Sequence, residues 1–170
     1  MSEPLPRVTE ILRATGWIDT SASWYSEHAR ERGTAVHRAC ALLAADDLDE
    51  DTVDPQIVGR LEAFRAFRAE QRPAILASED EIRNEIHGYA GRPDFRMQFA
   101  GSEWVIDLKP PSAAKWHPIQ LAAYAHGYER PMRRANLYLS DSARYRFVER
   151  VNLVDWRKFL QALELYRRMT

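Results

Sequence analysis

The chain of 170 residues is 45% hydrophobic and 29% charged, with a net charge of −1 at pH 7. This length and composition predict one folded domain over residues 1–170 and argue against disorder. No apolar run reaches the roughly 18 residues that a bilayer span needs, and residues 1–12 lack the pattern of a secretory signal, so we expect a cytoplasmic protein. The single cysteine, Cys40, excludes an internal disulfide and a four-cysteine metal or cluster site.

Charge is distributed unevenly along the chain. From Arg130 onward there are 10 basic and 4 acidic residues, whereas the first 129 residues hold 14 basic and 21 acidic ones. An acidic run over 46–54 is typical of a solvated connector between helices. The basic C-terminal third is compatible with phosphate contacts but does not by itself identify a nucleic-acid partner.

Helical and strand patterns alternate along the chain, which is typical of an α/β fold. Apolar residues at helical spacing predict helices over 7–15, 21–46, 54–71, 116–129 and 154–169. A period of two predicts strands over 74–86, 92–100, 103–109, 134–140 and 144–151, the first three antiparallel. We therefore expect N-terminal helices in 1–73, a sheet core with a crossing helix in 74–150 and a C-terminal helix in 151–170. Together they form an α/β/α layer around a mixed sheet of about five strands.

The strand predicted over 103–109 ends with an acid and a base. Asp107 and Lys109 are two residues apart, so they lie on one face of the strand. Asp94 lies on the strand before it, and 12 residues separate the two aspartates. That separation suits the rest of one strand, a tight turn and most of the next. We therefore expect Asp94 and Asp107 to meet at one edge of the sheet, with Lys109 close by.

This combination of side chains indicates a metal-dependent hydrolytic site. Two carboxylates at close range repel each other unless a cation lies between them. Their oxygens suit Mg²⁺ or Mn²⁺, which keep several waters and complete their shell with substrate phosphate. A lysine beside them can position an attacking water and balance developing negative charge, so a phosphodiester could be hydrolysed here. The alternative is that Asp107 and Lys109 form an ordinary surface ion pair.

Two helices add candidate side chains at one-turn spacing. In "ERGTAVHRAC", Gly33 and His37 are four apart, so a small residue would allow close approach to the face that carries the histidine. Gln120 and Tyr124 are also four apart, with His117 on much the same face. These side chains could bond a phosphate, orient the lysine or stack on a base. Both sets also have an ordinary interpretation. His37 could be a histidine at the boundary of the core, and the face with Gln120 and Tyr124 could be the polar edge of a packing helix.

The ordered set G-x-x-x-H, a glutamate, G-x-x-D, D-x-K and Q-x-x-x-Y resembles the RecB-like branch of the PD-(D/E)XK nuclease superfamily. "PRVTEIL" and "DWRKFLQALELY" are similar to the opening motif and closing helix of that branch, so the resemblance spans nearly the full chain. Phage-type exonucleases and the mitochondrial genome maintenance exonuclease are similar members. The resemblance implies a restriction-endonuclease-like α/β/α domain and a deoxyribonuclease that depends on Mg²⁺ or Mn²⁺.

The same resemblance implies metal-binding and catalytic roles for five residues. His37, Asp94 and Asp107 would bind the divalent metal. The backbone carbonyl of Leu108 would be a further ligand, and Lys109 would position the water nucleophile.

It also implies supporting roles. Gln120 and Tyr124 would brace the lysine and contact the nucleic-acid strand. Glu79 matches the glutamate of the family and would act as a catalytic group outside the first metal shell or at a second metal. Glu81 and Glu85 share its expected strand face and remain alternatives.

The chain departs from the family in two places. Pro110 and Pro111 follow the lysine where the family often has Thr-Gly, and because proline donates no N–H this loop cannot contact phosphate in the same way. The lone Cys40 excludes the iron–sulfur cluster of one branch. We expect the loop to present Lys115 and Trp116 to a single strand through charge and stacking. The alternative is that Trp116 caps the following helix against the core.

Three functional classes remain. We favour a deoxyribonuclease, and among deoxyribonucleases an exonuclease, that acts on DNA ends or single strands in recombination, repair or phage DNA processing. The second class is a catalytically weak nucleic-acid-binding subunit, and the third is an α/β structural protein whose acids pair with arginines. A binding role does not require Asp94, Asp107 and Lys109 together. Endonuclease or exonuclease action, strand polarity, DNA or RNA preference and assembly with itself or a recombination partner are not specified by these motifs.

Overall fold

The computed structural model describes residues 4–19, 21, 27–130 and 132–170. Its helices are α1 (Val8–Ala14), α2 (Glu27–Ala44), α3 (Val58–Gln71), α4 (His117–Ala125) and α5 (Val154–Met169), with short 3-10 turns at Glu50–Thr52 and Pro55–Ile57. Its strands are β1 (Ala74–Ser78), β2 (Ile82–Asn84), β3 (Tyr89–Gly91), β4 (Phe95–Phe99), β5 (Ser102–Lys109), β6 (Arg133–Leu139) and β7 (Tyr145–Glu149). Within these ranges no helix combines the length and apolar character that crossing a membrane requires.

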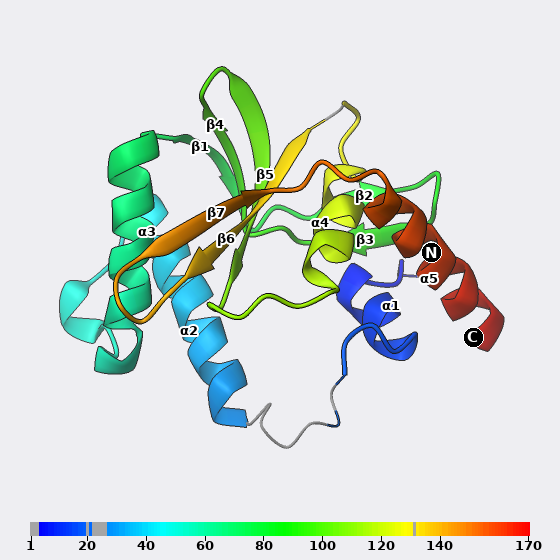
Figure 1. Cartoon of the computed structure of the whole chain (residues 1–170), viewed down its shortest axis with the longest axis horizontal. Coiled ribbons are helices and arrows are strands. Elements are labelled where there is room, and N and C mark those ends of the chain that lie inside the picture. The colour runs from blue at the N-terminus through cyan, green and yellow to red at the C-terminus, as the bar shows by residue number, and fades with distance from the viewer. Residues whose placement is uncertain (1–3, 20, 22–26, 131) are drawn as a thin grey trace.

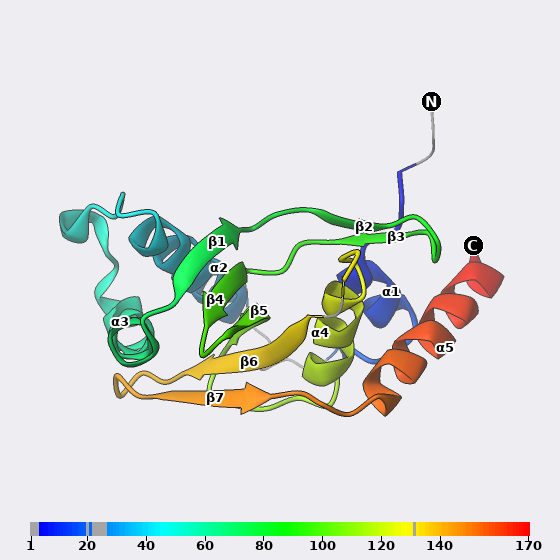
Figure 2. The same cartoon turned by 90° about the horizontal axis from the view of Figure 1, so that it is seen from above.

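Five strands form a mixed sheet in the order β1-β4-β5-β6-β7. The first three are antiparallel, β5 and β6 are parallel, and β7 returns antiparallel to β6. The parallel pair is joined by α4, because parallel neighbours need a crossover connection. Helices α2 and α3 cover one face of the sheet, and α4 with α1 and α5 lies on the other (Figures 1 and 2). This is the predicted α/β/α architecture around a five-stranded mixed sheet.

The sheet separates two apolar cores. On the side of α2 and α3, Phe64 stacks on Phe95 with ring centroids 5.4 Å apart, and both rings are buried. On the other side, Tyr89 meets Phe159 of α5 edge to face at 4.9 Å. Strand β5 contributes to both cores through the alternation of its side chains. Its C-terminal end is therefore buried on both faces, and any polar residue there is enclosed.

The single strand predicted over 74–86 is wrong. Strand β1 ends at Ser78, and Glu79 adopts a positive φ of 54° while its N–H donates to the Asp94 carbonyl at 2.9 Å. The chain leaves the main sheet at this point. Its period-two pattern continues in β2, which pairs with β3 in a separate hairpin. Strand β3 itself was not predicted.

Helix boundaries differ by a few residues from the predicted ones. Helix α2 begins at Glu27, and residues 22–26 of the helix predicted over 21–46 lie outside the described part of the chain. Helix α4 ends at Ala125 instead of 129. Helix α5 spans Val154–Met169, as predicted from its apolar spacing.

Candidate active site

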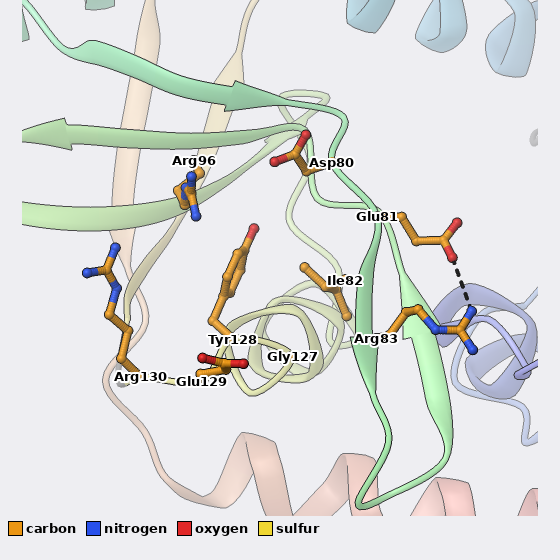
Figure 3. Close-up of a pocket in the computed structure, with 9 residues that line it drawn as sticks. All are labelled: Asp80, Glu81, Ile82, Arg83, Arg96, Gly127, Tyr128, Glu129 and Arg130. Carbon is orange, nitrogen blue, oxygen red and sulfur yellow. Dashed lines mark ion pairs between the residues drawn. The ribbon is translucent and has the colours of Figure 1, made fainter.

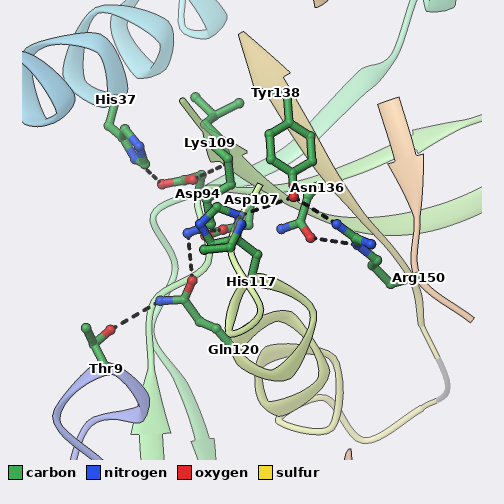
Figure 4. Close-up of polar contacts among 12 residues, drawn as sticks. Thr9, His37, Asp94, Asp107, Lys109, His117, Gln120, Asn136, Tyr138 and Arg150 are labelled. Carbon is green, nitrogen blue, oxygen red and sulfur yellow. Dashed lines mark hydrogen bonds and ion pairs between the residues drawn. The ribbon is translucent and has the colours of Figure 1, made fainter. Parts of the chain in front are cut away.

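Asp94 is held between helix α2 and strand β5. It directly precedes β4, whose first residue pairs with Ile106, so Asp94 lies opposite Asp107 in the antiparallel ladder. One carboxylate oxygen accepts a hydrogen bond from the backbone N–H of Leu108 at 2.6 Å. The other lies 2.7 Å from Nδ1 of His37, which donates because a carboxylate can only accept (Figure 4). The register therefore places Asp94 opposite Asp107, as the hairpin spacing predicts.

Asp107 and Lys109 form a buried ion pair. Their residues are 4% and 8% exposed, and Lys109 Nζ lies 2.6 Å from Asp107 Oδ2. Nζ also donates to Oε1 of Gln120 at 2.7 Å and lies 4.6 Å from the centroid of the Trp116 ring. The alternative of a surface ion pair is therefore wrong. Burying such a pair costs several kcal/mol of desolvation that surface pairs do not incur.

The two carboxylates differ in their affinity for protons. Burial acts to raise the pKa of Asp94, but the charge and hydrogen bond of His37, with Lys109 and the Leu108 N–H, hold it below its usual range. Burial raises the pKa of Asp107 to about 6, and the negative charge of Asp94 adds to this, against the opposing effect of Lys109. Of the two carboxyl groups, Asp107 therefore takes up a proton more readily than Asp94.

The carboxylate oxygens at this site are suitable ligands for a hard divalent cation. Asp107 Oδ2 is buried, and its partner in the described structure is Nζ of Lys109 at 2.6 Å. No group of three or more His, Cys, Asp or Glu side chains among the described residues is arranged to hold a metal ion. Mg²⁺ does not need such a group, because it is commonly bound by one or two carboxylates, waters and substrate phosphate. Asp94 and Asp107 meet that requirement, whereas His37 is engaged with Asp94.

Helix α4 supplies the support for the lysine. Gln120 is 5% exposed; its carbonyl oxygen accepts from Lys109 and its amide lies 3.3 Å from the hydroxyl of Thr9 in α1. Tyr124, 4% exposed, lies against Gly91, where an added Cβ would approach the Tyr124 ring to 2.7 Å. Tyr124 is thus packed beneath the hairpin, and stacking on a base would require its ring to leave this packing.

The three candidate glutamates lie in different surroundings. Glu79 is exposed, and its backbone is bonded to Asp94. Glu81 forms ion pairs with Arg7 and Arg83, at 2.9 and 3.6 Å, and Glu85 pairs with Arg83 at 2.9 Å. Among the described residues, Glu79 is the one of the three that is bonded to Asp94, and this hydrogen bond joins the two backbones.

The loop before α4 places its two candidates differently. Lys115 is exposed, whereas Trp116 is half-buried and occupies the N-cap position of α4. The Trp116 ring packs edge-on against His117 at 4.4 Å between centroids and lies over the ammonium group of Lys109. Leu108 is 1% exposed with its side chain in the core that faces α2 and α3, so only its backbone is available to the site.

A second polar network adjoins the cluster and was not predicted. His117 Nδ1 lies 3.1 Å from the hydroxyl of Tyr138, which also accepts a hydrogen bond from Arg150 at 2.8 Å. Arg150 Nε donates to Oδ1 of Asn136 at 3.0 Å (Figure 4). Asn136 and Tyr138 pair in register with Asp107 and Lys109. In the sequence, Asn136 and Tyr138 are two residues apart in "RANLYLS" and so lie on one face of the strand. That they adjoin Asp107 and Lys109 follows only from the β5–β6 register.

One pocket lies away from this cluster. It has a volume of about 630 Å³ and is lined by residues between β2 and the end of α4, among them Arg96 and Tyr128 (Figure 3). Arg96 lies 5.9 Å from the centroid of the Tyr128 ring. Of the candidate site residues, Glu81 alone, the alternative to Glu79, is among the described residues that line this pocket.

Comparisons with known proteins give a limited result. No protein-family model and no curated protein sequence matches the chain. The crystal structure of SSO0001 is similar over 100% of this chain and 78% of its own, with 16% sequence identity and a TM-score of 0.49. An alkaline exonuclease (LHK-Exo) from Laribacter hongkongensis is similar over 97% of this chain and 87% of its own, with 11% identity and a TM-score of 0.49. At these values the functional argument depends on the site itself.

Proposed function

We propose that this protein is a divalent-metal-dependent deoxyribonuclease that hydrolyses phosphodiester bonds. The observation that carries the proposal is the buried cluster of Asp94, Asp107 and Lys109, in which two carboxylates lie on paired strands beside one ammonium group. Lys109 lies against Asp107 and His37 against Asp94, so both carboxylates and both basic groups are gathered at one point of the sheet. A cation site beside a lysine is the arrangement that phosphodiester hydrolysis requires.

Asp94 and Asp107 would hold Mg²⁺ or Mn²⁺, with His37 and the Leu108 carbonyl as further candidate ligands. The metal, when bound, supplies Lewis-acid stabilisation of negative charge on the phosphate. Lys109 donates a hydrogen bond to the attacking water. It is kept in place by the Gln120 carbonyl at 2.7 Å and by the Trp116 ring, which also covers it from solvent.

The proposed substrate is DNA, at ends or in single strands. In the described part of the chain the surface next to His37 is open, because a Cβ added to Gly33, one turn before it on α2, would meet no described atom within 4 Å. A phosphate can thus approach Asp94 from the side of α2. Lys115 is exposed at the end of the preceding loop and is available for a strand that passes over Trp116.

The test is a cleavage assay with Mg²⁺ or Mn²⁺ against EDTA. Linear single-stranded, linear duplex and closed circular DNA would be compared, with Asp107→Asn and Lys109→Met as variants that preserve approximate side-chain size. We expect metal-dependent loss of linear DNA that both variants abolish. Cutting of circles would make the enzyme an endonuclease. Binding without cleavage of any substrate would contradict the proposal and favour a nucleic-acid-binding subunit.

A further inference from the structure

Strands β6 and β7 extend the face of the sheet that carries Asp107 and Lys109. Residues paired in register share a face, and Lys109 pairs with Tyr138, which in turn pairs with Arg146 of β7. Arg150 lies four residues further along, and its N–H donates to the Arg134 carbonyl at 2.9 Å, so the pairing of the two strands continues to it. Both arginines therefore lie on the same face as the catalytic candidates.

Tyr138 holds the two guanidinium groups. The Arg146 guanidinium lies 4.2 Å from the centroid of the Tyr138 ring, and Arg150 Nη2 donates to the Tyr138 hydroxyl at 2.8 Å. Arg150 also donates to the side-chain oxygen of Asn136. The two guanidinium groups are thus held in position by uncharged side chains and not by a carboxylate.

Neither guanidinium has an anionic partner in the part of the chain that the structure describes. The recorded contacts of Arg146 and Arg150 are with Tyr138, Asn136 and the Pro111 carbonyl, which lies 3.5 Å from Arg146. Neighbouring arginines of β6 are neutralised: Arg133 pairs with Glu149 at 2.9 Å and Arg134 with Asp155 at 3.2 Å. Two ordered, uncompensated cations on one face form a binding site for anions.

The surroundings carry the same sign of charge. Burial, followed by the positive charges of Lys109 and Arg150, lowers the pKa of His117 to about 3. Arg146 reaches the loop that follows Lys109, where Pro110 donates no backbone N–H. A phosphate in this position would need side-chain donors, which the guanidinium groups provide.

We propose that Arg146 and Arg150 bind backbone phosphates of the nucleic-acid strand on the β7 side of the cleavage site. The proposal rests on the proposed nuclease function and identifies the part of the surface along which the strand lies. Two planar cations spaced along one strand of the sheet can contact successive phosphates without reading base identity.

The test is equilibrium binding of a short fluorescent single-stranded oligonucleotide in EDTA, measured by anisotropy over a series of NaCl concentrations. Arg146→Gln is the main variant, because this exposed side chain has no buried hydrogen bond. Arg150→Lys, which keeps the charge and loses the two-point geometry, is the second. Arg168→Gln is the matched control, since Arg168 is an exposed residue of α5 paired with Glu164.

We expect Arg146→Gln to weaken binding roughly three- to fivefold, the range of an exposed charge pair. The slope of log K against log salt should become shallower by about 0.7, the value for one phosphate contact on a single strand. Arg150→Lys should weaken binding with little change in slope, and the control should change neither. A duplex probe measured in parallel shows which strand form the surface prefers.

Unchanged affinity and slope in Arg146→Gln, or the same loss in the control, would overturn this inference. Its failure is distinguishable from failure of the proposed function. Binding with the expected slopes but no metal-dependent cleavage would contradict the nuclease and leave the phosphate surface standing. Metal-dependent cleavage together with unaltered binding by Arg146→Gln would support the nuclease and contradict the phosphate surface.

Discussion

His37 and Asp94, which are 57 residues apart in the chain, meet with Nδ1 2.7 Å from Oδ1. Partial burial acts to lower the pKa of His37, but the charge of Asp94 and this hydrogen bond outweigh it and raise the pKa. The contact joins helix α2 to the start of β4. It therefore fixes the position of one carboxylate of the candidate site from the opposite layer of the fold.

Replacing His37 by Ala should weaken Mn²⁺ binding roughly ten- to hundredfold, the usual effect of removing a partner that orients a ligand. The measurement is a calorimetric titration of the protein with Mn²⁺. His28→Ala is the control, because His28 lies on the same helix and is exposed, and among the described residues its side chain is bonded only to Gln56. Equal Mn²⁺ affinity in both variants would show that His37 has no part in the metal site.

Replacing Gln120 by Ala should lower kcat roughly tenfold and leave KM nearly unchanged. The reason is that Lys109 Nζ loses an acceptor at 2.7 Å that holds it in position, while the surface that contacts the strand is intact. Steady-state kinetics on linear DNA measures both constants, and Gln98→Ala on the exposed side of β4 is the control. A raised KM with unaltered kcat would instead make Gln120 a direct contact of the nucleic acid.

Acidification should destabilise the protein through His117. Its pKa is about 3 in the folded state, below its unfolded value of about 6.5, so its contribution is complete above the unfolded pKa and is lost as pH falls. Between pH 7 and pH 5 this one group should cost about 2 kcal/mol. Urea unfolding of the wild type and His117→Gln at both pH values measures the difference. A pH dependence equal in the two proteins would contradict this assignment.

Replacing Gly91 by Ala should destabilise the protein by about 1–3 kcal/mol, because overpacking forces a shift of a buried ring. The added Cβ would lie 2.7 Å from Tyr124 and 3.2 Å from Val8. Gly33→Ala is the matched control: the site is helical and open, so alanine should be neutral or stabilise by up to about 1 kcal/mol. Thermal unfolding of both variants tests the pair, and an unaltered Tm for Gly91→Ala would contradict the steric argument.

The five motifs were found from local sequence because each is short and has a regular spacing. Helix α5 was predicted with its observed ends, since its apolar residues recur without interruption. The strand over 74–86 could not be divided correctly, because its pattern of alternation continues through Glu79. The strand ends there because Glu79 has a positive φ and because its N–H is bonded to Asp94. Neither feature can be read from the types of the neighbouring residues.

The sequence by itself determined the α/β class and the order of the five helices and the five main-sheet strands along the chain. It also determined the proximity of Asp94 to Asp107, because hairpin spacing is a local constraint. Only the tertiary structure decided that Lys109 is buried and held by Gln120, and that Asn136, Tyr138 and Arg150 adjoin it. These relations depend on the parallel register of β5 and β6. That register is determined by how α4, the helix that connects the two strands, packs against the sheet. The spacing of residues along the chain does not determine it.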